Sequence, residues 1–163
     1  IEVSFVDITN AEEVSRAILP NTKMIYCESV SNPLLEVADI RGLSRLAKAR
    51  HIPLVVDNPF TPLTIAPARL GADIVIHSLT KFINGTSDAV AGVVCASRDF
   101  CLALKDVNDG ACMLLGSTLD SLRAASILKN MRTLHLTIKK HSENALFLAR
   151  QFEKDNLSFF ANS

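Results

Sequence analysis

Short apolar runs alternate with segments of helical spacing along the first two thirds of the chain. Pro53–Asp57 (PLVVD) and Asp73–His77 (DIVIH) are continuous apolar runs rich in β-branched residues, a pattern typical of strands that are buried on both faces. Between such runs, as in Asp39–Arg50, the apolar residues recur at helical spacing. The pattern predicts strands at Ile1–Val6, Lys23–Glu28, Pro53–Asp57, Asp73–His77 and Ala91–Ala96.

The remaining periodic segments are predicted to be helices. Asp39 is a suitable N-cap, and Gly71 is a suitable residue to follow a short helix. Strand–helix–strand alternation implies right-handed crossovers, so the predicted fold class is α/β, with a mostly parallel sheet and helices on both faces. The predicted helices are Asn10–Leu19, Asp39–Arg50, Pro67–Leu70, Asp99–Val107, Thr118–Met131 and Thr137–Asp155.

Polar side chains directly follow three of the predicted strands. Asn32 follows the strand at Lys23–Glu28, Asp57 ends the next strand, and Ser78, Thr80 and Lys81 follow the one after it. Ligands of open α/β sheets bind beyond the carboxyl ends of parallel strands. A carboxylate, two hydroxyls, a lysine and an amide are therefore expected to converge on one rim of the sheet.

Such a rim suits the chemistry of pyridoxal 5′-phosphate (PLP). A lysine amine forms a Schiff base with an aldehyde cofactor, a carboxylate keeps the pyridine nitrogen protonated, and hydroxyls hold the phosphate. Lys81, Asp57, and the pair Ser78 and Thr80 match these needs. Taken singly, each residue has an ordinary structural interpretation as a cap, a turn former or a solvated side chain. The residues alone do not distinguish PLP from a ligand such as a phosphosugar.

The amino-acid composition of the chain limits the kinds of molecule that it is expected to bind. The 163 residues include 48% hydrophobic and 21% charged residues, enough to bury the core of one domain. Lys plus Arg and Asp plus Glu number 17 each, which gives no reason to expect nucleic acid or a membrane surface. The four cysteines form no C-x-x-C pair, so we expect reduced, mostly buried thiols of a cytoplasmic protein, and no metal site. No apolar stretch approaches the length of a membrane span.

Four stretches resemble one known family. They are YCESVSNP at 26–33, VVDNPFTP at 55–62, LGADIVIHSLTKFINGTSDAVAGVV at 70–94 and MRTLHLTIKKHSENA at 131–145. They are similar to the core signature of the Cys/Met-metabolism PLP enzymes. That family includes cystathionine γ-synthase, cystathionine β- and γ-lyases, methionine γ-lyase and O-acetylhomoserine sulfhydrylase. The S-x-T-K segment ending at Lys81 is the most specific part of the resemblance.

The resemblance implies a fold and a role for each residue. The fold is the aspartate-aminotransferase type (fold type I), whose large domain binds PLP. Lys81 would carry the cofactor, Asp57 would pair with the pyridine nitrogen, and Ser78 and Thr80 would contribute to the phosphate and lysine environment. Asn32 would lie near the phenolic oxygen of the cofactor and the substrate carboxylate. The family also implies an amino-acid substrate and a homo-oligomer, a dimer or tetramer, with active sites between subunits.

The expected reaction is β- or γ-elimination (C–S lyase) on a sulfur amino acid such as cystathionine or methionine. A γ-replacement transferase is the alternative, because lyases and transferases share every residue named above. A non-catalytic PLP-binding or scaffold protein is a further alternative, since Pro59 and Thr86 depart from the family pattern. Residues 1–163 are expected to be a fragment of the large domain, with the last helix leading toward a missing smaller domain, and to be inactive alone.

Overall fold

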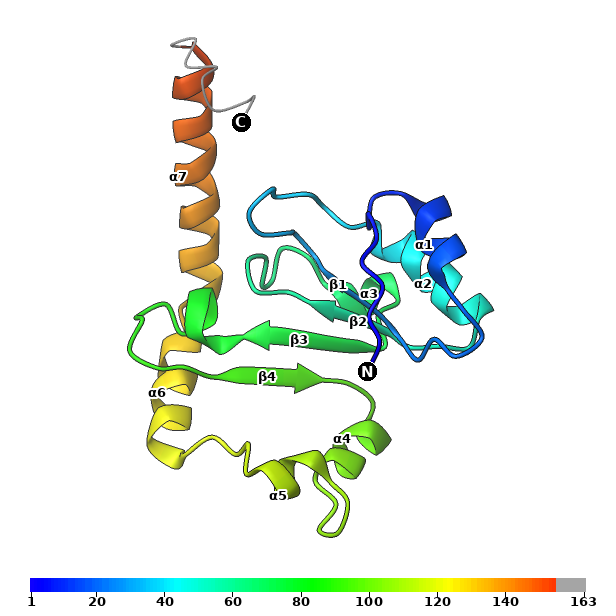
Figure 1. Ribbon diagram of the computed structural model, residues 1–163. Helices are drawn as coiled ribbons and strands as arrows, with labels where there is room; N and C mark the ends of the chain where they lie inside the picture. Colours follow the sequence, from blue (N-terminus) through cyan, green and yellow to red (C-terminus); the bar gives the residue numbers. More distant parts are fainter. Residues whose placement is uncertain (155–163) are drawn as a thin grey trace.

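A four-stranded sheet lies at the centre of the structure, a computed structural model that describes residues 1–154 (Figure 1). Its strands, in spatial and sequence order, are β1 (Ile25–Glu28), β2 (Leu54–Asp57), β3 (Ile74–Ser78) and β4 (Gly92–Cys95). The first three strands run parallel, and β4 runs antiparallel to β3. The predicted α/β class with a mostly parallel sheet is confirmed.

The strand register places the carboxyl ends of the parallel strands at one rim. Glu28 of β1 lies opposite Asp57 of β2, and Asp57 lies opposite Ile76 of β3. Strand β3 continues for two more residues and ends at Ser78, opposite Gly92 of β4. Residues that follow β1, β2 and β3 therefore leave the sheet from the same edge.

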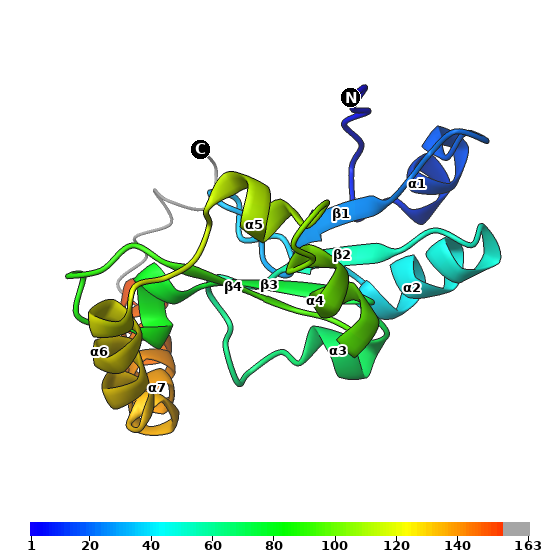
Figure 2. The ribbon, with the colours of Figure 1, turned by 90° about the horizontal axis from the view of Figure 1, so that it is seen from below.

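Helices α1 (Ala11–Ala17) and α2 (Ile40–Ala49) share a buried core with β1 and β2, and α3 (Pro67–Leu70) contacts α2 and β3. Asp39 is the N-cap of α2, as predicted, and its Oδ1 accepts a hydrogen bond of 3.0 Å from the Gly42 backbone N–H. Figure 2 shows α2 and α3 on one side of the sheet and α5 on the other. The buried core on this side consists of Val14, Ile25, Cys27, Ala38, Ile40, Leu43, Ala47, Leu54 and Val56.

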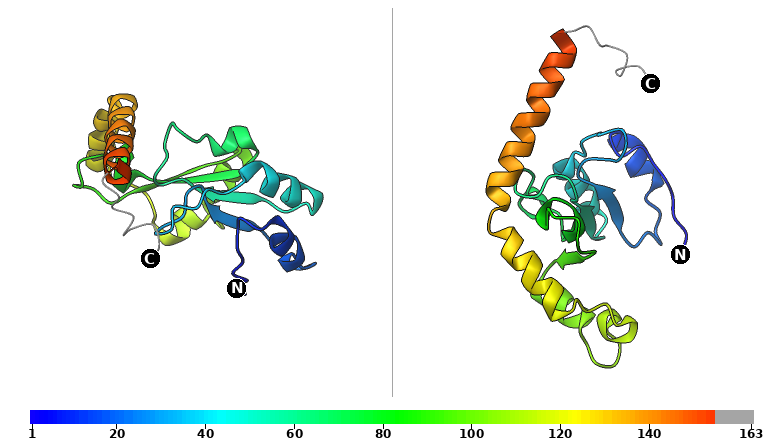
Figure 3. Two further views of the ribbon diagram at one scale, coloured as in Figure 1. Left: turned by 90° about the horizontal axis from the view of Figure 1, so that it is seen from above. Right: turned by 90° about the vertical axis from the view of Figure 1, so that its left-hand side faces the viewer.

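The second half of the chain is helical, with α4 (Arg98–Leu104), α5 (Ala111–Leu115), α6 (Ser121–Met131) and α7 (Leu134–Lys154). Helices α6 and α7 follow one another along one flank of the sheet (Figure 3). A second core packs the turn after β3 against these two helices, which anchors the segment around Lys81. Its buried members are Ile83, Ala89, Ile127, Leu134 and Ile138. Within residues 1–154, no helix is long and apolar enough to cross a bilayer.

Several details differ from the sequence predictions: α4 ends at Leu104 rather than Val107, and α6 begins at Ser121 rather than Thr118. The predicted strand at Ile1–Val6 is wrong, because no strand among the described residues pairs with it and its Val6 packs against the first core instead. The last helix begins at Leu134 rather than Thr137, and its predicted end at Asp155 lies outside the described residues. Helix α5 was not predicted.

The cysteines are less buried than expected. All four are free thiols, but Cys27 alone is buried; Cys95 is exposed, and Cys101 and Cys112 are half-buried. Cys27 lies on the core face of β1, and burial raises the pKa of its thiol to about 11.

We expect Cys27 to resist alkylation in the native protein while Cys95 reacts. The thiolate is the reactive form, and a buried thiol with a raised pKa is both protonated and inaccessible at pH 8. Iodoacetamide labelling followed by peptide mass spectrometry measures both residues in one sample, with urea-unfolded protein as the control. Equal labelling rates of the two thiols in the native state would contradict the burial of Cys27.

Candidate active site

Asp57 lies at the carboxyl end of β2, on the face of the sheet opposite α2. Leu54 and Val56 point into the first core, so the alternation of side chains along a strand directs Asp57 to the other face. Tyr26 of β1 shares that face, and its hydroxyl donates a hydrogen bond of 3.1 Å to Asp57 Oδ2. Asp57 Oδ1 is buried, and no group among the described residues bonds to it.

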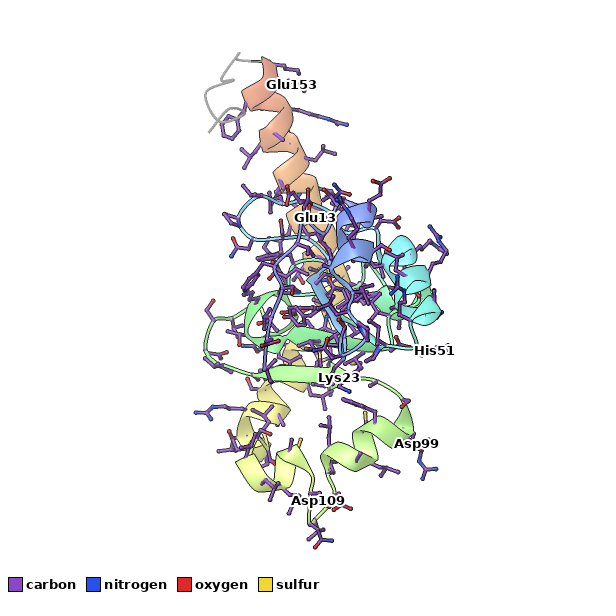
Figure 4. The ribbon with its side chains drawn as sticks, turned by 45° about the vertical axis from the view of Figure 1, so that its right-hand side comes forward. Glu13, Lys23, His51, Asp99, Asp109 and Glu153 are labelled. Atoms are coloured by element: carbon purple, nitrogen blue, oxygen red, sulfur yellow. The ribbon has the colours of Figure 1, made fainter. Side chains whose placement is uncertain are left out.

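The environment of Asp57 differs from that of the ionisable side chains labelled in Figure 4. Those side chains lie at the periphery of the molecule and are exposed or half-exposed: Glu13, Lys23, His51, Asp99, Asp109 and Glu153. A buried polar atom without a partner costs about 1–3 kcal/mol. An N–H donor from a ligand would remove that cost at Asp57 Oδ1, so the carboxylate fits a protonated ring nitrogen such as that of PLP.

Lys81 lies in a single turn, η1 (Leu79–Ile83), that directly follows β3. Its backbone departs from helical geometry, with φ −90° and ψ −121°. Its Nζ lies 4.7 Å from the centroid of the Phe60 ring, within range of a cation–π interaction. Phe60 itself packs edge-to-face on Phe82, with ring centroids 6.4 Å apart. These contacts hold the exposed Lys81 amine beside the loop that follows Asp57.

Thr80 and Ser78 occupy different positions around this turn. The Thr80 hydroxyl accepts a 2.9 Å hydrogen bond from the Ala91 backbone N–H and donates one of 3.2 Å to the Ala91 carbonyl. Thr80 therefore ties the turn that carries Lys81 to the segment entering β4, and its hydroxyl is already engaged. Ser78 ends β3 and is partly exposed at the rim.

Asn32 lies on the loop after β1. Its backbone N–H donates a 2.9 Å hydrogen bond to Glu28 Oε2, and the residue is exposed. Glu28 is the register partner of Asp57, so this bond places Asn32 on the same rim. The structure thus brings the five predicted site residues to the carboxyl ends of β1, β2 and β3.

Beneath the rim lies a buried polar network centred on Asn58, which sequence reasoning did not assign to the site. The fully buried Asn58 accepts hydrogen bonds at Oδ1 from Ser29 Oγ, at 2.7 Å, and from Thr61 Oγ1. Its Nδ2 donates to the Ile65 carbonyl at 3.1 Å, and its own carbonyl lies 2.9 Å from His77 Nδ1. One residue thus joins the ends of three strands and fixes the backbone next to Asp57. This contact gives the His77 ring a backbone hydrogen-bond partner within the network.

Asn58→Ala is expected to lower the free energy of unfolding by about 2–4 kcal/mol, because it leaves several buried polar groups without partners. Urea denaturation monitored by circular dichroism measures this change. Asn108→Ala, at an exposed position, is the matched control and should change stability by less than about 0.5 kcal/mol. Equal stability of the two variants would contradict the proposed role of the network.

Comparison with known proteins shows to which family the chain belongs. A family model described as Cys/Met metabolism PLP-dependent enzyme matches residues 1–158. Methionine gamma-lyase of Arabidopsis thaliana is 43% identical over 152 residues, which cover 93% of this chain and 34% of that protein. Cystathionine beta-lyase MetC of Staphylococcus haemolyticus is 42% identical over 149 residues, covering 89% of this chain and 37% of that protein.

Solved structures agree with these sequence matches. The crystal structure of metB from Corynebacterium glutamicum superimposes with a TM-score of 0.82 and 32% identity, over 91% of this chain and 38% of that one. Cystathionine gamma-lyase from Lactobacillus plantarum, complexed with L-serine, gives a TM-score of 0.73 and 34% identity, over 82% of this chain and 34% of that one. The chain spans little more than a third of the length of these relatives. With its family signature present over almost all of its length, the chain belongs to the Cys/Met-metabolism PLP-dependent enzymes.

Proposed function

We propose that the protein is a PLP-dependent enzyme that eliminates the side chain of a sulfur amino acid by cleaving its C–S bond. The observation that carries this proposal is that Oδ1 of Asp57 is buried with no hydrogen-bond partner among residues 1–154, on the same rim as the amine of Lys81. The relatives named above include both a methionine gamma-lyase and a cystathionine beta-lyase. The activities that their names state support the choice of a sulfur amino acid as substrate.

Each residue at the rim would contribute to a different part of the cofactor site. Lys81 would attach it covalently, and Asp57 Oδ1 would accept the N–H of its ring nitrogen. Ser78 would offer a hydroxyl to the phosphate. Thr80 would hold the turn that carries Lys81 in place, because its hydroxyl is hydrogen-bonded to the Ala91 backbone. Asn32 would face the phenolic oxygen of the cofactor and the substrate carboxylate.

When bound, PLP supplies an electron sink that makes the Cα–H bond of the amino acid acidic. The protein must then provide a base near that carbon. Lys81 Nζ would be the group that takes the Cα proton of the substrate and returns it later in the reaction. The Phe60 ring, 4.7 Å from Nζ, would keep the amine beside the rim.

A γ-replacement transferase remains the second candidate. Cystathionine gamma-synthase of Haemophilus influenzae is 40% identical over 147 residues, which cover 89% of this chain and 39% of that protein. That identity is close to the identity with the lyases. The residues on the rim serve elimination and replacement equally, because both reactions begin with removal of the same proton.

Product analysis of the protein expressed from its complete gene tests the proposal. A γ-lyase acting on methionine releases methanethiol, 2-oxobutanoate and ammonia, and this is the expected result. Cystathionine formed from O-acetylhomoserine and cysteine, without 2-oxobutanoate, would favour the transferase. PLP bound without conversion of methionine, cystathionine or O-acetylhomoserine would contradict the enzymatic proposal and favour a non-catalytic role.

We also propose that residues 1–163 form part of the PLP-binding large domain of a cytoplasmic homo-oligomer, a dimer or tetramer. Exposed apolar side chains such as Val94, Leu114 and Leu115 support an oligomer, since such surfaces associate. The free cysteines support a reducing compartment. Light scattering of the purified protein from its complete gene measures the oligomeric state, and a monomer would contradict this assignment.

A further inference from the structure

The contact between Tyr26 and Asp57 follows from the register of two strands. Tyr26 of β1 lies opposite Val55 of β2, so Asp57 is its diagonal neighbour on the same face of the sheet. A diagonal neighbour is within reach of a long aromatic side chain. The tyrosine hydroxyl lies 3.1 Å from Asp57 Oδ2, to which it donates, while Oδ1 has no hydrogen-bond partner in the part of the chain that the structure describes.

We propose that Tyr26 is a positioning residue for the cofactor: by donating to Asp57 Oδ2, it orients the carboxylate so that Oδ1 faces the ring nitrogen. This role rests on the proposed function, because it requires a ligand whose N–H meets Oδ1. A carboxylate held at one oxygen cannot rotate freely about its terminal torsion. The carboxylate is therefore already oriented when the ligand binds. The free-energy cost of ordering this side chain is part of folding and does not weaken binding.

Tyr26 does not behave as a core residue. Its exposed fraction is 54%, and it lies outside both buried clusters, so packing alone gives little reason for an aromatic side chain there. Its hydroxyl, in contrast, donates a hydrogen bond to Oδ2 of the half-buried Asp57 carboxylate. The main interaction of Tyr26 is therefore its hydrogen bond to Asp57 and not the burial of its ring.

The hydroxyl stays protonated over any physiological pH range. Burial raises the pKa of Tyr26 to about 12, with further contributions from the negative charge of Asp57, its hydrogen bond and the charge of Glu28. A tyrosine that keeps its proton remains a donor to Asp57. Glu28 does not compete for this donor through Oε2, because that oxygen accepts the Asn32 backbone N–H.

Two substitutions at Tyr26 separate the contribution of its hydroxyl to PLP binding from the contribution of its ring. Tyr26→Phe keeps the ring and removes the donor, whereas Tyr26→Leu removes both. Loss of a hydrogen bond to a charged group predicts a PLP dissociation constant raised roughly 5- to 20-fold in both variants. We expect the two variants to be alike, since the ring itself contributes little. A Tyr26→Leu defect far larger than that of Tyr26→Phe would show that ring packing matters instead, and would overturn the proposal.

A titration tests the contact without the cofactor. The absorbance difference at the tyrosinate band between wild type and Tyr26→Phe reports on this one residue, because the signal of any other tyrosine cancels in the difference. After a rapid jump of the apo protein to pH 11, a group with a pKa of about 12 is roughly one tenth ionised, against about nine tenths at the ordinary value of 10. Asp57→Asn removes a neighbouring charge and should increase the ionised fraction. An unchanged fraction in Asp57→Asn would overturn the contact.

The outcomes distinguish this role from the proposed function. Wild-type protein that takes up PLP, with Tyr26→Phe binding PLP as tightly and turning over as fast, would overturn the positioning role alone. Wild-type protein from the complete gene that takes up no PLP would overturn the proposed function and this role together. Weakened PLP binding in Tyr26→Phe, with an unchanged urea midpoint, is the result expected.

Discussion

Lys81→Ala is expected to abolish covalent retention of PLP and to reduce turnover by about 10³-fold or more. The substitution removes both the amine proposed to attach the cofactor and the base proposed to move the Cα proton. General base catalysis alone contributes roughly 10²- to 10⁴-fold. The loss of covalent attachment adds to that effect. Visible absorbance of the dialysed protein measures retention, and steady-state kinetics measure turnover.

The matched control is Lys105→Ala, which removes an exposed lysine after α4. It should retain PLP and wild-type kcat, because Lys105 lies away from the strand ends at which the site forms. A Lys81→Ala protein that stays yellow after dialysis and turns over at the wild-type rate would show that another residue carries the cofactor.

Asp57→Asn is expected to lower kcat by roughly 10²- to 10³-fold, equivalent to about 3–4 kcal/mol of transition-state stabilisation. Asparagine keeps the shape of the side chain but removes the negative charge that favours the protonated ring nitrogen. The ring then withdraws electrons less strongly when the Cα–H bond breaks. The buried position of Oδ1 makes this effect large, because solvent screens the charge poorly there.

Asp109→Asn is the control for this second prediction. Asp109 is exposed at the periphery, as Figure 4 shows, and its substitution should leave kcat unchanged. If Asp57→Asn also retained near wild-type kcat, the assignment of Asp57 to the ring nitrogen would be refuted.

The sequence predicted the rim of the site for a physical reason. Pro53–Asp57 and Asp73–His77 are apolar β-branched runs, and such runs form buried parallel strands with their carboxyl ends at one edge. Polar residues directly after the runs must then gather at that edge. The place of Asp57 and Lys81 at that edge could therefore be predicted from sequence position alone.

Contacts that depend on strand register could not be predicted in the same way. The hydrogen bond from Tyr26 to Asp57 requires β1 and β2 to align so that Tyr26 lies opposite Val55, and a single sequence does not specify this alignment. The network around Asn58 likewise joins three strand ends. At Ile1–Val6 the local pattern favoured a strand, but a strand also needs a neighbour, which local pattern does not supply.

The most direct test of the account is to locate the lysine that carries PLP. Borohydride reduction of the protein from its complete gene fixes the cofactor to its lysine, and trypsin does not cleave after a modified lysine. Residues 70–98 contain Lys81 as their only internal cleavage site, so we expect PLP on one uncleaved peptide, Leu70–Arg98. PLP fixed on any other lysine, with 70–81 and 82–98 recovered as separate unmodified peptides, would show that Lys81 does not carry the cofactor.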